Sequence, residues 1–189
     1  MMEAARPVCI YEFAGIAAIA EQLREARAAG DQRLVDEDKM TAAVAADRLR
    51  VATALAADWR RVVDHAPRPA RIADDAEILA MLSQALPAAI ARRDKAYRAL
   101  VANAPQYRHY VLDELWALSD RCRSFSEALQ DDIVEYVRPW LQAQNVANAL
   151  AAMLWWQQRT GPESIHFLVD TTIALRERAR VEGEGRLAA

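Results

Sequence analysis

The sequence predicts an all-α fold, an antiparallel multi-helix bundle of five to seven helices, some of them kinked at proline. Among 189 residues there are only 5 Gly and 7 Pro, and a chain with so few turn-forming residues has little capacity for β-hairpins. Apolar residues recur at helical spacing over most of the chain. Such helices bury their apolar faces best around one shared core, so we expect a single helical domain over residues 1–189.

Two long helices are expected in the N-terminal third. Residues 10–29 place apolar side chains on one helical face, and Gly30 is positioned to end that helix. Residues 33–65 contain neither Gly nor Pro, so a second helix of about 30 residues is expected there. Whether residues 36–65 form one helix or a helix-turn-helix is left open by the sequence.

A proline-containing stretch at residues 66–71 interrupts the helical pattern, because each proline disfavours helix at the residue before it. This stretch is a possible break between an N-terminal helical hairpin and a C-terminal bundle. Asp74 or Asp75 is then expected to cap a helix that reaches Asn103. Pro87 should kink or split that helix, since it removes a backbone donor.

Serine and proline positions divide the C-terminal half into further helices. Serine is a favoured N-cap, and proline fits the first turn of a helix but bends or divides its interior. The tail at 183–189 is expected to be frayed. The expected helices span residues 107–123, residues from Ser124 or Ser126 through Pro139 to Trp156, and residues from Pro162 to about Arg180.

Charge and cysteine content limit the kinds of partner and site expected of this chain, for which the cytoplasm is the expected compartment. Lys and Arg number 24 against 27 Asp and Glu, so the net charge of −3 excludes a uniformly basic nucleic-acid coat. Cys9 and Cys122 lie far apart and form no metal or redox motif. The richness in alanine and arginine is typical of a bacterial chain with GC-rich codons.

Residues 139–158 carry no charge. An uncharged stretch of this size has the usual length of a membrane span. Six Asn and Gln side chains within them would need partners in lipid, so the sequence predicts a buried core helix and no membrane partner.

A second interpretation of residues 41–61 resembles a helix-turn-helix, which would make the chain a DNA-binding regulator. Thr41 would cap the first helix and small alanines would let the second approach closely. One uninterrupted helix explains the same spacing and is the preferred reading. If nucleic acid binds, the candidate contacts to phosphates are Arg48, Arg50, Arg60 and Arg61.

Acidic and histidine patterns are too sparse to predict catalysis, a metal or a cofactor. Asp131, Asp132 and Glu135 form a DDxxE pattern, but acidic residues are common in the first turn of an ordinary helix. Glu163 and His166 have the spacing of one half of a di-iron site, and the second half is missing. An enzymatic or small-ligand-binding bundle that uses Asp113, Glu114, Asp131 or Glu135 remains a second alternative.

Large apolar side chains concentrate near the predicted helix around Pro139. Adjacent tryptophans cannot share one helical face, so one of them must meet another helix, a ligand or a partner. The candidates for such an interface are Trp140, Met153, Trp155 and Trp156.

These observations favour a binding or assembly protein that acts through protein–protein contacts, with self-association included. No cofactor is expected, and nucleic acid is the less favoured partner.

Overall fold

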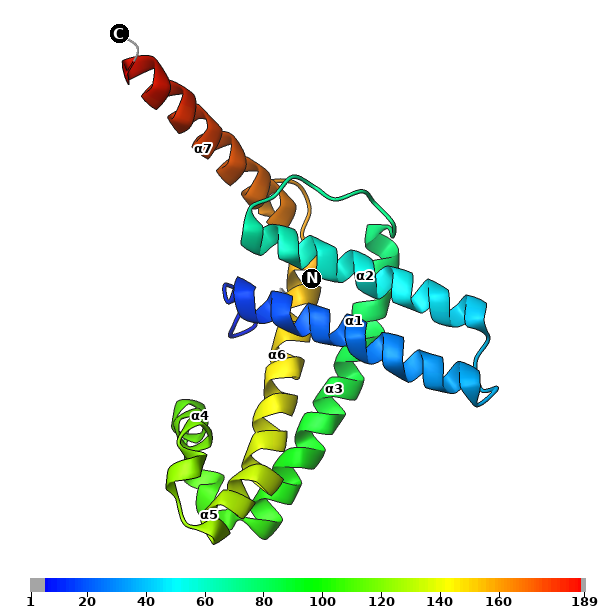
Figure 1. Cartoon of the computed structure of the whole chain (residues 1–189), viewed down its shortest axis with the longest axis vertical. Coiled ribbons are helices and arrows are strands. Elements are labelled where there is room, and N and C mark those ends of the chain that lie inside the picture. Colours follow the sequence, from blue (N-terminus) through cyan, green and yellow to red (C-terminus); the bar gives the residue numbers. More distant parts are fainter. Residues whose placement is uncertain (1–5, 188–189) are drawn as a thin grey trace. The chain divides into compact units, whose positions relative to one another are not determined.

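The computed structural model describes residues 6–187, and the side chains of residues 6–182 (Figure 1). Within that range the secondary structure is helical and contains no strand, which confirms the all-α multi-helix prediction. The antiparallel arrangement of the whole bundle stays a prediction. The helices are α1 (Phe13–Asp36), α2 (Ala42–Asp64), α3 (Asp75–Asn103), α4 (Leu112–Asp120), α5 (Glu127–Asp132), α6 (Arg138–Gln157) and α7 (Ile165–Leu187).

The chain packs as two compact units. The first combines the chain up to Leu82 with the chain from Ala152 onward, and the second is Ser83–Ala151. Helices α3 and α6 each begin in one unit and end in the other. The stretch at 66–71 lies inside the first unit, and the prediction of a single domain over 1–189 remains a prediction.

In the first unit, α1 and α2 lie side by side as a helical hairpin (Figure 1). Ile16 and Ile19 of α1 are buried, as are Leu55 and Val62 of α2. These residues recur at helical spacing, so each helix presents one apolar stripe to the core.

The predicted end of the first helix at Gly30 is wrong, because α1 continues to Asp36. A glycine within a helix costs only about 1 kcal/mol, and packing against α2 decides the length of α1. The chain turns at Asp38, whose φ of 55° is the left-handed conformation that Asp tolerates better than most residues. The expected helix over 33–65 is therefore two helices, which meet at the 37–41 turn.

Helix α2 is continuous, which confirms the preferred reading of residues 41–61 and excludes a helix-turn-helix there. Thr41 caps it, because the Thr41 hydroxyl accepts a hydrogen bond from the Val44 amide at 3.3 Å. Arg50 lies in the middle of α2, at the position where the motif requires a turn. The apolar residues of α2 follow one helical spacing on both sides of Arg50, so a continuous helix buries them on a single face.

Residues 66–71 are not helical, as predicted. His65 ends α2 in the left-handed conformation, with φ of 50°. A capping box then starts α3: the Glu77 amide donates to Asp74 Oδ1 and the Asp74 amide donates to Glu77 Oε2, both at 2.8 Å.

Proline positions in the second unit have different effects. Pro87 does not split α3, which runs through it. Before Pro139 the helix changes type, because a π-helical turn at Ile133–Val137 joins α5 to α6. Proline has no backbone N–H to donate, and the wider hydrogen-bond spacing of a π-helical turn accommodates this loss. The change of helix type agrees with the prediction that Pro139 bends or divides this helix.

The expected helix over 107–123 is wrong in extent. Only α4 is α-helical there, flanked by 3₁₀ turns at Pro105–His109 and Cys122–Ser124. Glu114 sets the start of α4, because its carboxylate accepts the Val111 amide at 2.9 Å. A core closes this unit around Leu100, Ala104, Tyr107, Leu115, Cys122, Ile133, Val137 and Leu141.

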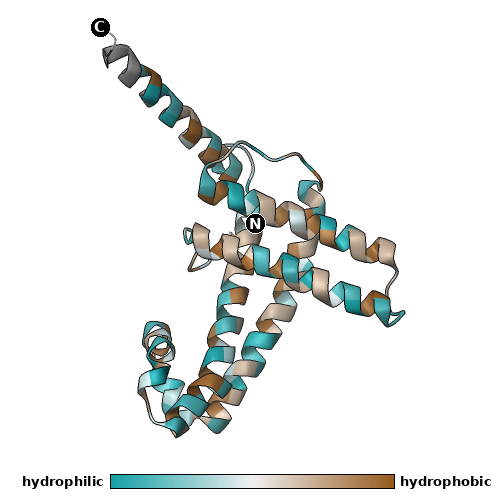
Figure 2. Cartoon of the chain, viewed as in Figure 1, coloured by the Kyte–Doolittle hydropathy of each residue, from teal (hydrophilic) through white to brown (hydrophobic). Residues whose placement is uncertain are grey.

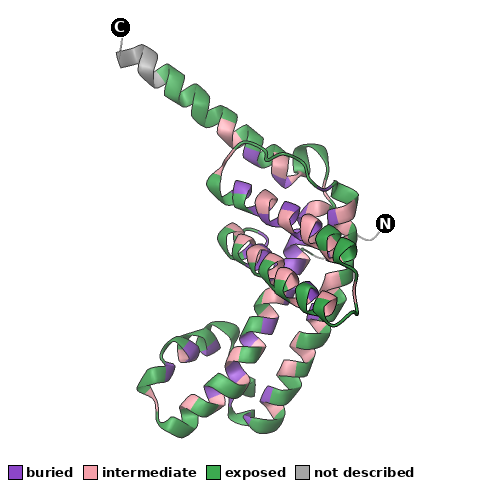
Figure 3. Cartoon of the chain, turned by 45° about the vertical axis from the view of Figure 1, so that its right-hand side comes forward, coloured by how far each residue is buried: buried purple, intermediate pink, exposed green. Residues whose placement is uncertain are grey.

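The final helix starts three residues later than predicted. Pro162 lies in a 3₁₀ turn at Gly161–Glu163, and the Ser164 hydroxyl then accepts the Phe167 amide at 3.1 Å. Beyond Ile173 the side chains of α7 are exposed as far as residue 182 (Figure 3). Hydrophobic and hydrophilic residues are interspersed along it (Figure 2). The backbone is helical to Leu187, so the expectation of a frayed tail at 183–189 is wrong for residues 183–187, and residues 188–189 lie outside the described residues.

Among the helices described, none combines the length and the apolar character that crossing a bilayer requires. This agrees with the expectation that residues 139–158 belong to a core helix.

Candidate functional site

Two of the four interface candidates lie in the core of the first unit. Met153 is 1% exposed and Trp156 is 4% exposed. The Trp156 indole Nε1–H donates to the Ile10 carbonyl at 2.8 Å, and its ring packs edge-on against Tyr11. Trp156 therefore holds the N-terminal segment against α6.

The other two tryptophans are half-buried. Trp155 lies edge-on to Trp156, with the guanidinium of Arg159 over its ring. Trp140 belongs to the second unit, where it packs against the core at 5.7 Å from the ring of Tyr97. The sequence predicted that one of these tryptophans must contact another helix, a ligand or a partner. Side chains of the chain itself supply most of these contacts.

Two of the four candidate arginines connect α2 to α1 and to the start of α3. Arg48 forms an ion pair with Asp31 of α1 at 3.1 Å. Arg50 donates to Asp47 and to Glu77, and also to the carbonyl of Ile72. These bonds attach the start of α3 to α2, and they occupy the guanidinium groups that a phosphate would need.

Arg61 lies in the centre of a polar cluster between α2 and α7, which we define as Asp58, Arg61, His166 and Asp170. Its side chain is 1% exposed, and it forms an ion pair with Asp170. Arg61 Nη1 lies 3.0 Å from His166 Nδ1. Because a guanidinium can only donate, Nδ1 accepts, and the proton of the neutral imidazole sits on Nε2, which faces Asp58 Oδ2 at 3.9 Å.

Burial controls the titration of this cluster. It raises the pKa of Asp58 and lowers the pKa of His166, in each case because the charged form loses hydration. His166 and Asp58 partly offset these shifts in each other by mutual attraction. Arg68 and Asp75 also act on both groups from the linker and from α3. The cluster thus fixes the start of α7 on α2 with an imidazole held neutral.

We expect the stability of the protein to fall as the pH drops below the unfolded pKa of histidine, about 6.5. The unfolded state then binds a proton that folded His166 resists, and the loss is complete once the pH passes below the lowered folded pKa. Asp58 has the opposite sign, because acidification relieves the burial of its carboxylate. The His166→Gln variant removes only the first effect, since glutamine still offers an acceptor to Arg61.

Thermal unfolding at about pH 7.5 and about pH 5.5 checks this expectation. The drop in Tm should be smaller in His166→Gln than in the unmodified protein. An equal drop in both proteins would show that His166 is not held neutral by the fold.

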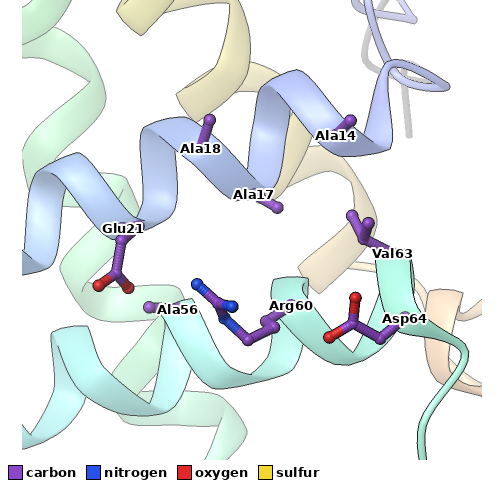
Figure 4. A pocket seen from close by; sticks show the side chains of 8 residues that line it. All are labelled: Ala14, Ala17, Ala18, Glu21, Ala56, Arg60, Val63 and Asp64. Atoms are coloured by element: carbon purple, nitrogen blue, oxygen red, sulfur yellow. The ribbon is translucent and has the colours of Figure 1, made fainter.

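A groove of about 370 Å³ runs between α1 and α2 (Figure 4). Its α1 wall carries residues at positions 14, 17, 18 and 21, and its α2 wall carries residues at 56, 60, 63 and 64, which is helical spacing on both sides. The lining combines small apolar side chains with a few charged ones. It consists of Ala14, Ala17, Ala18, Glu21, Ala56, Arg60, Val63 and Asp64.

Charged side chains border the alanine floor of the groove. Glu21 and Arg60 extend toward one another from opposite walls (Figure 4). The pKa of Glu21 is lowered, chiefly by its hydrogen bond from Arg24 and also by the positive charge of Arg60. Arg60 is thus the one nucleic-acid candidate that lines the groove, and carboxylates lie on both sides of it.

Within the described residues, no three His, Cys, Asp or Glu side chains converge on a common point. Asp132 of the DDxxE pattern accepts a hydrogen bond from Gln106 at 2.8 Å, and His166 faces Asp58 rather than Glu163. These contacts explain both patterns within the fold.

Sequence reasoning missed both the groove and the polar cluster. The alanines at 14, 17 and 18 have the spacing of one helical face, and this signal was readable in the sequence. The pairing of Arg61 with His166 had no such signal, because the two residues are 105 positions apart.

Comparison of the chain with protein-family models, curated protein sequences and solved structures finds no match, so the function is argued from geometry.

Proposed function

We propose that this chain is a non-enzymatic assembly protein that binds helices of another protein chain in the groove between α1 and α2. The carrying observation is the groove itself, an alanine-floored channel between two long helices with charged residues at its border. Alanine lets helix axes approach closely, and dispersion contacts along such a channel add up over several turns. The charged border then selects the partner and its register.

The groove replaces the tryptophans as the proposed binding surface. Trp156 and Met153 are enclosed by their own unit, whereas Ala14, Ala18 and Arg60 are exposed. An interface needs accessible side chains around a central apolar area, and the groove supplies them.

A cytoplasmic, bacterial setting is part of this proposal. Both cysteines are free thiols, and chains without disulfides are typical of reducing compartments.

DNA binding is not proposed. The helix-turn-helix at residues 41–61, on which that alternative depends, would need a turn at Arg50 and free guanidinium groups on one face. Instead α2 is continuous, and Arg48, Arg50 and Arg61 are each paired with carboxylates.

We expect Ala17→Trp to abolish assembly while the fold is retained. Ala17 lies on the groove wall and points toward α2 (Figure 4), so an indole there fills the groove without entering the core. Size-exclusion chromatography with light scattering measures the assembled mass. Ala174→Trp is the matched control, since Ala174 is exposed on α7 outside the groove.

The control should assemble like the unmodified protein, with the same helicity by circular dichroism. Assembly that survives Ala17→Trp would place the binding surface elsewhere. An unmodified chain that remains a 21.1 kDa monomer and carries no partner would remove the proposal.

A further inference from the structure

We propose that α7 is an acid-releasable arm: its start docks on α2 while His166 is neutral, and protonation of His166 weakens this docking and releases the arm. The groove between α1 and α2 plays no part in the release, so the arm and the groove can be tested separately. Two features of the first unit point to such an arm, namely the small docked part of α7 and the donors and acceptors of the polar cluster.

The docked part of α7 is short. Ile165 is 6% exposed and Val169 is 4% exposed, whereas beyond Ile173 the side chains are exposed as far as residue 182 (Figure 3). The turn before α7 contains Gly161, whose φ of 58° is a left-handed conformation that glycine adopts without strain. Roughly two helical turns and the polar cluster therefore hold the arm, so a change in one contact has a large effect on docking.

The imidazole of His166 is the acceptor on which the cluster depends. Arg61 Nη1 lies 3.0 Å from His166 Nδ1, and a guanidinium can only donate. In a protonated imidazole both ring nitrogens donate, so turning the ring offers Arg61 no acceptor either. The Arg61 side chain is 1% exposed, and its pairing with Asp170 is already made. Protonation therefore sets two cationic donors against each other inside the contact of α2 with α7.

Charged groups from α2, the linker and α3 face His166, and they do not cancel the effect of its burial. Asp58 Oδ2 lies 3.9 Å from His166 Nε2, which is too long for a hydrogen bond. Asp58 and Asp75 attract a protonated imidazole, whereas Arg68 and Arg61 repel it. Burial is the largest influence, and it lowers the pKa of His166.

Release restores the ordinary titration of histidine. In water the pKa of the His166 side chain returns to about 6.5, so below that pH the released arm binds a proton that the docked arm resists. Docking is therefore strongest above about pH 6.5 and weakens as the pH falls toward the lowered docked value. Asp58 acts in the opposite direction, because burial raises the pKa of its carboxyl and the docked arm then gains from acid.

Hydrogen exchange of the α7 amides, followed by mass spectrometry, tests the release. The exchange rate of residues 165–173 is divided by that of an unfolded chain at the same pH, and this ratio reports how often the arm opens. Between about pH 7.5 and about pH 5.5 we expect the protection of these amides to fall about three- to tenfold, since the released arm binds one more proton. Helix α1 should keep its protection, and circular dichroism should show unchanged helicity.

Two histidine variants serve as a matched pair. His166→Gln keeps an acceptor for Arg61 and has no titrating ring, so its α7 protection should stay constant or increase on acidification. His109→Gln removes an exposed histidine from the 3₁₀ turn at Pro105–His109 and should respond like the unmodified chain. If His166→Gln does not fold, a pH series on the unmodified chain replaces it, and the protection of α7 should begin to fall near pH 6.5, about the ordinary pKa of histidine.

Each outcome decides for or against the arm. A loss of α7 protection that persists in His109→Gln and disappears in His166→Gln supports it. Constant protection in the unmodified chain overturns it, as does an equal loss in His166→Gln or a loss that begins only near about pH 4, where carboxylates titrate. An equal loss of protection in α1 would mean that the whole unit opens, and it would overturn a local release. Assembly through the groove is judged independently, by Ala17→Trp at neutral pH.

Discussion

Replacing Trp156 with alanine is expected to lower the free energy of unfolding by about 3 to 5 kcal/mol. The side chain is 4% exposed and its indole N–H donates to the carbonyl of Ile10. Its loss leaves a cavity between α6 and the N-terminal segment, and it also leaves a buried carbonyl without its donor. Urea denaturation followed by circular dichroism measures the change.

Trp155→Ala is the matched control for this expectation. Trp155 is half-buried, and its Nε1–H has no hydrogen-bond partner among the described residues, so its removal should cost clearly less. Should Trp156→Ala leave unfolding unchanged but weaken self-association, Trp156 would lie at an interface, as its sequence position suggested.

Arg61→Ala is expected to lower the free energy of unfolding by about 3 kcal/mol. The guanidinium is enclosed between α2 and α7, where it binds His166 and pairs with Asp170. Without it, the buried carboxylate of Asp58 loses a neighbouring positive charge and the start of α7 loses its attachment to α2. Denaturant titration of the variant measures the loss.

Arg61→Met separates packing from charge at this position. Methionine keeps the apolar stem of the side chain, and Arg61 Nε already lacks a partner among the described residues, so Met should cost less than Ala. Equal losses in the two variants would mean that the ionic contacts carry the stability, and no loss in either would mean that α7 is held by its apolar residues alone.

Helical periodicity and local caps predicted much of the fold. Thr41, Asp74 and Ser126 stand at the starts of α2, α3 and α5, because the short-range signals that begin a helix are encoded in neighbouring residues. Gly30 shows where such signals lose to packing. The low helix propensity of glycine favours the end of α1 at this residue. The packing of α1 against α2 nevertheless extends α1 to Asp36.

The candidate site was harder to predict, because it depends on which distant residues meet. Tryptophans at 155 and 156 were identified as needing neighbours, but only the fold shows that Ile10 and Tyr11 supply them to Trp156. Arg60 and Arg61 are adjacent in sequence, and the sequence assigns both to one candidate phosphate surface. Consecutive residues of a helix are rotated by about 100°, which places Arg61 in the core and Arg60 at the groove, so their environments are unrelated.

The most direct test of assembly through the groove is a native mass spectrum of the gently purified, unmodified chain. We expect a species that carries added protein mass beyond the 21.1 kDa chain and that dissociates to single chains in Ala17→Trp. A spectrum that holds only single chains, with no added protein mass at any concentration, would contradict the assembly function.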